Sequence, residues 1–210
     1  MNQKNGKNSL GLDSCFEDLD NPIELFKHWF SKAGEKEIND PNAVALATSD
    51  KNNQPNVRMV LLKGLSDKGF VFYSNFRSKK GGELKINQKA SMCFHWKSLR
   101  RQVRVIGKVE EVTSKEADDY YNSRPYKNRI SAWASSQSQI LDKRETFLNK
   151  IKEYEKKYPD ENNVPRPPHW SGWRLLPNEI EFWVDGEGRI HERLNYKNNN
   201  GEWEKEILYP

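Results

Sequence analysis

Residues 101–112, which read RQVRVIGKVEEV, are the stretch that decides the fold class. Apolar and polar side chains alternate along it with a period of two, so each kind falls on its own face of an extended chain: Val103, Val105 and Val109 on one, and Gln102, Arg104 and Lys108 on the other. This alternation predicts a half-buried β-strand.

Short apolar runs separated by turn-forming residues lie on both sides of this strand. They cover residues 43–48, 57–63, 70–74 and 90–96 before it, and residues 170–175, 180–184, 190–197 and 203–208 after it. Residues 198–201, which read NNNG, supply a turn between the last two runs. The pattern predicts antiparallel strands joined by hairpins.

Helical patterns surround these strands. Asn21 suits a helix cap and Pro22 the first helical position, and an apolar stripe follows at Ile23, Phe26, Trp29 and Phe30. Further helices are predicted over residues 78–88, 116–123, 130–135 and 143–158. Residues 1–20 are polar and predict a flexible N-terminal arm. Together these strands and helices predict a mainly β protein with peripheral helices (α+β), built as a barrel or a sandwich. Residues 21–210 are expected to form one domain.

Composition narrows the class of protein. The chain has 210 residues, a net charge of +5, and seven Trp, eight Tyr and nine Phe, which argues against disorder. Cys15 and Cys93 are too few for a disulfide framework, and no apolar run is long enough to span a membrane. The N-terminus lacks the apolar segment of a signal peptide, so the cytoplasm is the expected location. The positive charge fits an anionic partner or a solvated surface.

Most standard catalytic motifs are absent from the sequence, and a Ser-His-Asp triad stays open without a nucleophile-elbow pattern to support it. Cations placed on strands are what remain. If residues 189–193, RIHER, are extended, then Arg189, His191 and Arg193 share one face at spacings of about 6.6 Å, while Ile190 and Leu194 face a core. Such a face suits an anion or an electron-rich ring. A charged, solvent-facing edge strand fits the pattern equally well.

Three further clusters have the same ambiguity. Arg58 and Lys63 flank an apolar strand, Lys79 and Lys80 begin a helix whose dipole disfavours cations, and Tyr120 lies one helical turn before Arg124. Each cluster could hold a phosphate. Ordinary strand ends, a solvated first turn and surface packing are the alternatives.

Together the clusters resemble the pyridoxine/pyridoxamine 5'-phosphate oxidase family, over residues from about Asn21 to Pro210. Seven segments occur in the family's order and spacing: residues 58–63 (RMVLLK), 70–75 (FVFYSN), 101–103 (RQV), Tyr120 with 123–125 (SRP), 132–138 (AWASSQS), 180–183 (IEFW) and 189–193 (RIHER). The resemblance implies an antiparallel split β-barrel that works as a homodimer, with FMN at the subunit interface. It implies oxidation of pyridoxamine and pyridoxine 5'-phosphate to pyridoxal 5'-phosphate, with dioxygen as acceptor and release of hydrogen peroxide, and of ammonia from the amine.

The matched positions carry the family's roles. The implied cofactor-binding residues, some from the partner subunit, are Arg58, Met59, Val60, Leu61, Leu62, Lys63, Tyr73, Ser74, Lys79, Lys80, Gln102, Gln137, Ser138, Trp183 and Arg193. The implied substrate-binding residues are Lys63, Tyr120, Arg124, Asn128, Arg189 and His191. Arg189 and His191 are the implied catalytic pair, which covers the substrate ring, and no metal is expected.

The chain departs from the family pattern at several positions. Lys79 stands where Arg is usual, so the bidentate hydrogen bonding of a guanidinium is replaced by the point charge of an ammonium. Asn128 stands for Ser, Ser131 for Gly and Glu192 for Asp, and the arm lacks the Arg-Arg-x-Tyr stretch of some members. Three alternatives stay open: another split-barrel flavoprotein such as a flavin reductase, a β-barrel that binds RNA or single-stranded DNA, and a flavin or pyridoxal phosphate carrier without turnover.

Overall fold

A computed structural model describes residues 7–210 of the chain. Its helices are α1 (Pro22–Lys36), α2 (Lys79–Ile86), α3 (Ser114–Asn122), α4 (Tyr126–Ala134) and α5 (Arg144–Lys157), with short 3-10 turns η1 (Lys97–Leu99) and η2 (Glu187–Arg189). Its strands are β1 (Ala43–Ser49), β2 (Pro55–Leu61), β3 (Gly64–Ser66), β4 (Gly69–Asn75), β5 (Lys89–Trp96), β6 (Arg101–Glu111), β7 (Trp170–Val184), β8 (Glu192–Asn199) and β9 (Glu202–Ile207). None of these helices is long and apolar enough to cross a membrane.

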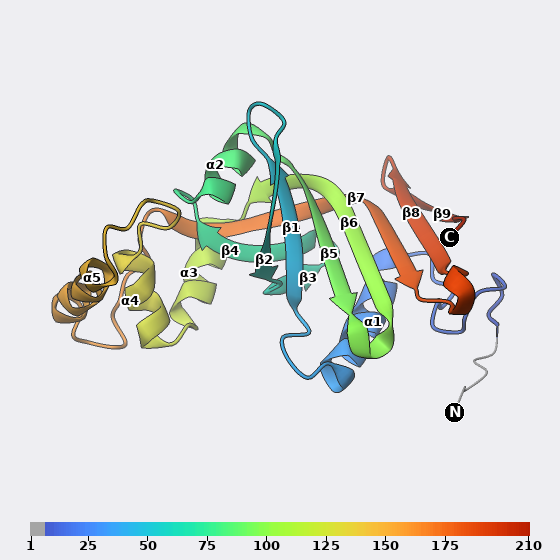
Figure 1. The fold of residues 1–210 in the computed structure, drawn as a ribbon, viewed down its shortest axis with the longest axis horizontal. Coiled ribbons are helices and arrows are strands. Elements are labelled where there is room, and N and C mark those ends of the chain that lie inside the picture. Colours follow the sequence, from blue (N-terminus) through green and yellow to red (C-terminus); the bar gives the residue numbers. More distant parts are fainter. Residues whose placement is uncertain (1–6) are drawn as a thin grey trace.

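The strands form one antiparallel sheet that curls into a half-barrel (Figure 1). The order is β2-β1-β5-β6-β7-β4-β3, and β8 continues from β7 to β9. Strand β6 lies between β5 and β7, and its Val103 and Val105 are fully buried, as the alternation predicts. The predicted split barrel with peripheral helices is confirmed.

Strand β7 is the longest in the sheet and changes partner half-way. One edge pairs with β6 throughout, whereas the other pairs with β4 over its first part and with β8 over its last part. Pro177, which has no amide hydrogen to donate, lies between the two parts. Opposite it, a Cβ on Gly107 would lie 2.0 Å from the Leu176 carbonyl oxygen, so only glycine fits. The two predicted strands at 170–175 and 180–184 are therefore one.

Helix α1 packs its apolar stripe into the barrel. Asn21 caps it by accepting from the Ile23 amide, and Pro22 occupies its first turn, as predicted. The Phe26 ring contacts Phe70 and Phe94, with ring centroids 4.9 and 5.0 Å apart. Burial of each such ring stabilises the fold by about 1.5–3 kcal/mol. This aromatic core holds the strands that carry the site.

The first described residues differ from the flexible arm that the polar composition of residues 1–20 predicts. Phe16 is fully buried in the main core, and Leu12 is nearly so. The Trp29 indole donates to the Cys15 carbonyl oxygen over 2.7 Å, and the Lys7 ammonium pairs with Glu192. Residues 7–20 are thus packed against the domain because their few apolar side chains find the core. Residues 1–6 lie outside the described part.

Candidate functional site

A cavity of about 370 Å³ opens between strands β2 and β4 and helices α3 and α4. Its lining residues come from widely separated parts of the sequence. Ten of them are implied site residues: Met59, Val60, Leu61, Lys63, Tyr73, Ser74, Lys80, Tyr120, Arg124 and Gln137. The remaining lining residues are Asn75, Ser131, Ala132, Ser135 and Trp170.

A stack of aromatic rings forms one wall of this cavity. The Tyr73 ring from β4 lies parallel to the Tyr120 ring from α3 at 4.0 Å and to the Trp170 ring from β7 at 5.4 Å. Burial raises the pKa of both phenols further above neutral, so each hydroxyl is a donor, and that of Tyr73 donates to the Glu116 carbonyl oxygen over 3.4 Å. The wall thus combines flat apolar surface with hydroxyl donors.

Arg124 is a half-buried cation that lies against this stack. Its guanidinium carbon is 4.7 Å from the Trp170 ring centroid and 5.9 Å from that of Tyr121. Its Nη1 is buried and finds no hydrogen-bond partner in residues 7–210. Burial lowers the pKa of Arg124, because the charged form loses water. A desolvated donor without a partner is costly, and an anion would satisfy it.

The charge on the cavity lining has one sign. Lys63, Lys80 and Arg124 line it, whereas the part of the chain that the structure describes contributes no carboxylate to it. Burial, and then the nearby charge of Arg58, lower the pKa of Lys80. The Ser74 hydroxyl is also buried, and no residue among 7–210 gives it a hydrogen-bond partner. Cations and unused donors in one open cavity favour a phosphorylated or otherwise anionic ligand.

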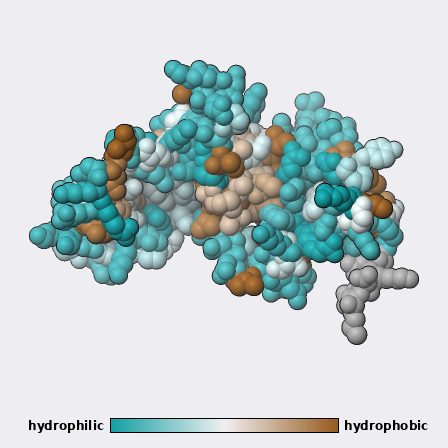
Figure 2. All heavy atoms as spheres, in the orientation of Figure 1, coloured by the Kyte–Doolittle hydropathy of each residue, from teal (hydrophilic) through white to brown (hydrophobic). Residues whose placement is uncertain are grey.

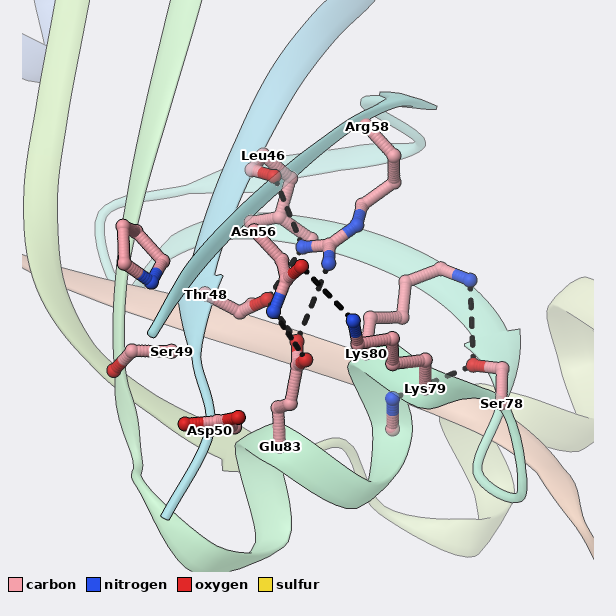
Figure 3. Close-up of polar contacts among 12 residues, drawn as sticks. Leu46, Thr48, Ser49, Asp50, Asn56, Arg58, Ser78, Lys79, Lys80 and Glu83 are labelled. Carbon is pink, nitrogen blue, oxygen red and sulfur yellow. Dashed lines mark hydrogen bonds and ion pairs between the residues drawn. The ribbon is translucent and has the colours of Figure 1, made fainter. Parts of the chain in front are cut away.

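A polar network connects β2 to α2 beside the cavity (Figure 3). The buried Glu83 carboxylate accepts from the Thr48 hydroxyl at 2.5 Å, from the Asn56 amide at 2.7 Å and from the Arg58 guanidinium at 3.2 Å. The Lys79 ammonium donates to Asn56 over 3.0 Å. The network therefore places Arg58 and Lys79 close to Lys80 at the start of α2. We call Arg58, Lys79 and Lys80 the cation cluster.

Other implied site residues gather at the far end of β7, and we call them the end cluster: Gln102, Trp183, Arg189, His191 and Arg193. Trp183 lies opposite both Gln102 and Arg193 in the sheet, and its ring is 4.7 Å from that of His191. The Arg193 guanidinium donates to the buried Glu181 carboxylate over 3.0 Å. Burial of that carboxylate makes the pairing a firm anchor for Arg193.

Residues 189–191 are not a strand, which corrects the extended geometry expected for residues 189–193. Arg189 ends the turn η2 with φ +65°, and β8 starts only at Glu192. Ile190 is 72% exposed rather than directed to a core. The turn forms because Gly186 approaches so closely that a Cβ there would lie 1.7 Å from the Ile190 carbonyl oxygen. Leu194 is fully buried, as expected.

The His191 ring is oriented by the same turn. The Gly186 amide lies 3.2 Å from His191 Nδ1. Within residues 7–210 the polar contacts of the ring are made by Nδ1, which leaves Nε2 as the nitrogen that a ligand could reach. The Asp185 carboxylate lies 3.2 Å from Nδ1 and also binds Arg100.

Three implied residues belong to none of the cavity lining, the cation cluster and the end cluster. Leu62 directly follows β2 and is buried in the main core. Asn128 and Ser138 are exposed and do not line the cavity. Arg124 lies in the link between α3, which ends at Asn122, and α4, which begins at Tyr126, and not on one helix with Tyr120 as predicted.

Trp170, Asn75 and Ser135 line the cavity but were not assigned a role from the sequence. Asn75 and Ser135 lie inside segments that resemble the family, so proximity in sequence was the available signal. Trp170 follows a proline-rich stretch and carries no motif. Its role depends on packing against Arg124, which no local pattern encodes.

Comparison with known proteins agrees with this geometry. Residues 30–158 match the family model described as pyridoxamine 5'-phosphate oxidase, and residues 170–210 match the pyridoxine 5'-phosphate oxidase C-terminal dimerisation region. The chain belongs to the pyridoxamine 5'-phosphate oxidase family. The cavity lies mainly in the first matched region and the end cluster mainly in the second.

Relatives within the oxidase family cover nearly the whole chain. A pyridoxine/pyridoxamine 5'-phosphate oxidase of Pelagibacter ubique is 60% identical over 98% of this chain and all of its own length. Its namesake in Agrobacterium fabrum is 53% identical over 95% of this chain and 98% of its own. Among solved structures, PhzG of Burkholderia lata, in complex with tetrahydrophenazine-1-carboxylic acid, has a TM-score of 0.88 at 28% identity, covering 98% of this chain and 100% of its own.

Proposed function

We propose that the chain is an FMN-dependent oxidase that converts pyridoxamine 5'-phosphate and pyridoxine 5'-phosphate to pyridoxal 5'-phosphate. The alcohol and dioxygen give the aldehyde and hydrogen peroxide, and the amine consumes one water in addition and releases ammonia. The names of the close relatives and the family membership support this reaction.

Arg124 is the observation that carries the proposal. A cation that is desolvated, stacked on Trp170 and left with an unpaired buried donor is set to bind a phosphate. Lys63 and Tyr120 line the same cavity and supply a second charge and a hydroxyl. Because the lining described here has no carboxylate, nothing in it competes with the substrate's phosphate.

The residues present fit FMN as the cofactor. The cation cluster would hold its phosphate, and the unpartnered Ser74 hydroxyl and Gln137 amide would meet polar atoms of the flavin. Residues 59–61 of β2 would lie along the ring system. Bound FMN would supply the two-electron redox chemistry, with dioxygen as the final acceptor.

The working unit of the proposal is a homodimer whose partner subunit completes each site. Val57, Met59 and Leu61 on edge strand β2 are 70%, 63% and 39% exposed. Figure 2 shows hydrophobic atoms gathered in the middle of this face, over β1 and β2. An apolar patch on an edge strand suits a second copy, and the match to a dimerisation region points the same way. The end cluster of one subunit would then face the cavity of the other.

In this arrangement the chain's own residues act mainly by position. Lys63, Tyr120 and Arg124 fix the phosphate, so binding energy from a non-reacting group orients the carbon that is oxidised. Arg189 and His191 of the other subunit cover the substrate ring and keep water out. His191, whose Nδ1 is held by the Gly186 amide, would meet the substrate through Nε2.

Peroxide release tests the proposal directly. Purified protein loaded with FMN should absorb as a flavoprotein and release peroxide in air with pyridoxine 5'-phosphate. Pyridoxine without the phosphate should give far less at the same concentration. A flavoprotein that turns over neither vitamer would support another split-barrel enzyme, and a protein that binds no flavin but binds oligonucleotides would support the nucleic-acid alternative.

A further inference from the structure

Lys79 is held in place by an amide, which is itself held by a buried carboxylate (Figure 3). The Lys79 ammonium donates to Asn56 Oδ1 over 3.0 Å, and Asn56 Nδ2 donates to Glu83 Oε1 over 2.7 Å. This chain of contacts runs from α2 through β2 and back to the first residue of α2. Asn56 therefore links a fixed acid to an exposed cation.

The orientation of the Asn56 amide is determined by its two neighbours. An ammonium offers only donors, and an ionised carboxylate offers only acceptors. The amide must therefore direct its amino group to Glu83 and its oxygen to Lys79. The reversed amide would set donor against donor at Lys79 and acceptor against acceptor at Glu83.

The Glu83 side chain is held in place by several contacts. It is 5% exposed and also accepts from Thr48 at 2.5 Å and from Arg58 at 3.2 Å. Arg58 in turn donates to the Leu46 carbonyl oxygen over 3.1 Å. These contacts leave the carboxylate little freedom. The Asn56 amide, which donates to this carboxylate, is therefore fixed as well.

Lys79 needs such a support for two reasons. It occupies the first position of α2, where the helix dipole disfavours a cation. Its flexible stem also carries about 2 kcal/mol of rotamer entropy, and its point charge lacks the planar fork of an arginine. Without an acceptor the ammonium would sample many positions in water.

We propose that Asn56 is a positioning residue that, braced by Glu83, orders Lys79 beside Arg58 and Lys80 to receive the phosphate of the flavin cofactor. This inference rests on the proposed function, in that FMN is the cofactor. FMN differs from riboflavin only by its phosphate. Asn56 therefore contributes to the affinity for FMN and not to the affinity for riboflavin.

Equilibrium titration of the full-length chain, freed of flavin, with FMN and with riboflavin tests this. Asn56→Leu keeps the side chain's size and the net charge but removes the hydrogen bonds to Glu83 and Lys79, together with a longer one to the Gln54 carbonyl oxygen. It should weaken FMN binding by about fivefold, the loss expected for one modest hydrogen bond, and leave riboflavin binding unchanged. In a Lys79→Ala background, Asn56→Leu should have no further effect. Gln54→Leu, an exposed amide that contacts neither Glu83 nor Lys79, is the matched control.

Each other outcome overturns the inference. Equal weakening of FMN and riboflavin would mean that Asn56 only stabilises the strand. An undiminished effect in the Lys79→Ala background would mean that Asn56 does not act through Lys79. If the wild-type chain prefers FMN and Asn56→Leu keeps that preference, the inference alone fails. If the wild-type chain shows no preference for FMN, the proposed function fails with it.

Discussion

Trp170 and Trp183 belong to the same strand, β7, yet each packs in a different group of site residues. Thirteen residue steps separate them, or about 43 Å along an extended strand. Trp170 packs on Arg124 at the cavity, and Trp183 packs on His191 in the end cluster. One protomer therefore does not bring both groups to one small ligand, whereas a symmetric pair can.

Loss of Arg124 should impair substrate binding far more than cofactor binding. In Arg124→Ala, we expect KM for pyridoxine 5'-phosphate to rise about 10- to 100-fold, because a charge-assisted hydrogen bond to phosphate is lost. Flavin content, measured by absorbance, should not change. Arg124→Lys should recover part of the loss, since it keeps the charge without the fork. Arg144→Ala, on the exposed start of α5, is the control, and equal loss of FMN would move Arg124 to the cofactor site.

Gly186→Ala should displace the turn that carries Arg189 and His191. The added Cβ would lie 1.7 Å from the Ile190 carbonyl oxygen, so the turn must open. We expect kcat/KM to fall about tenfold or more, since misplacement by an ångström can cost two orders of magnitude. Gly188→Ala is the control, because a Cβ there meets no atom within 4 Å, although its φ of +64° adds some strain. Equal activity of the two variants would contradict the role of the turn.

Phe16→Ala should destabilise the domain, although the surrounding sequence is polar. Phe16 is fully buried against Trp29, with ring centroids 5.4 Å apart. Truncation should lower the free energy of unfolding by about 3–5 kcal/mol in denaturant titrations at fixed protein concentration. Ile38→Ala, at a side chain that is 92% exposed, should change it by no more than about 0.5 kcal/mol. A similar small effect of Phe16→Ala would show that residues 7–20 are free of the core.

Cys15 should be unreactive in the folded protein. Burial raises the pKa of its thiol to about 12 from an ordinary value of 9.0, so the reactive thiolate is scarce at pH 8. In a Cys93→Ser variant, labelling of native protein by a thiol reagent should be much slower than labelling of unfolded protein. The labelling rate of the native protein should keep rising through pH 9–12, because the folded state disfavours the thiolate until the raised pKa is reached. A plateau near pH 9 would show an exposed thiol.

The sequence was most informative where local pattern and tertiary structure agree. Alternation predicted β6, and the cap at Asn21 predicted the start of α1. The single strand β7 was not predicted, because its change of partner near Pro177 depends on long-range pairing. Phe16 was missed because one aromatic in a polar stretch carries no periodicity.

For the candidate site, the resemblance supplied residues and the structure supplied their grouping. Lys63, Tyr120 and Arg124 come together at one cavity, as the resemblance implies. Arg189 was given strand geometry because Arg-x-His-x-Arg repeats every second residue, whereas the close approach of Gly186 decides the turn. The support of Lys79 by Asn56 involves residues far apart in sequence, which no motif joins. The cytoplasmic location stays a prediction.

Mixing two impaired variants, assayed at a substrate concentration far below the KM of Arg124→Ala, tests the composite site most directly. One variant is Arg124→Ala, in the cavity, and the other is Arg189→Ala/His191→Ala, in the end cluster. The two variants are mixed in equal amounts, unfolded together and refolded. Half of the randomly formed dimers then contain one subunit of each variant, and each such dimer has one of its two sites intact. Peroxide release with pyridoxine 5'-phosphate should then recover to about a quarter of the wild-type rate. Activity no higher than that of the two variants refolded separately would contradict a site built from both subunits.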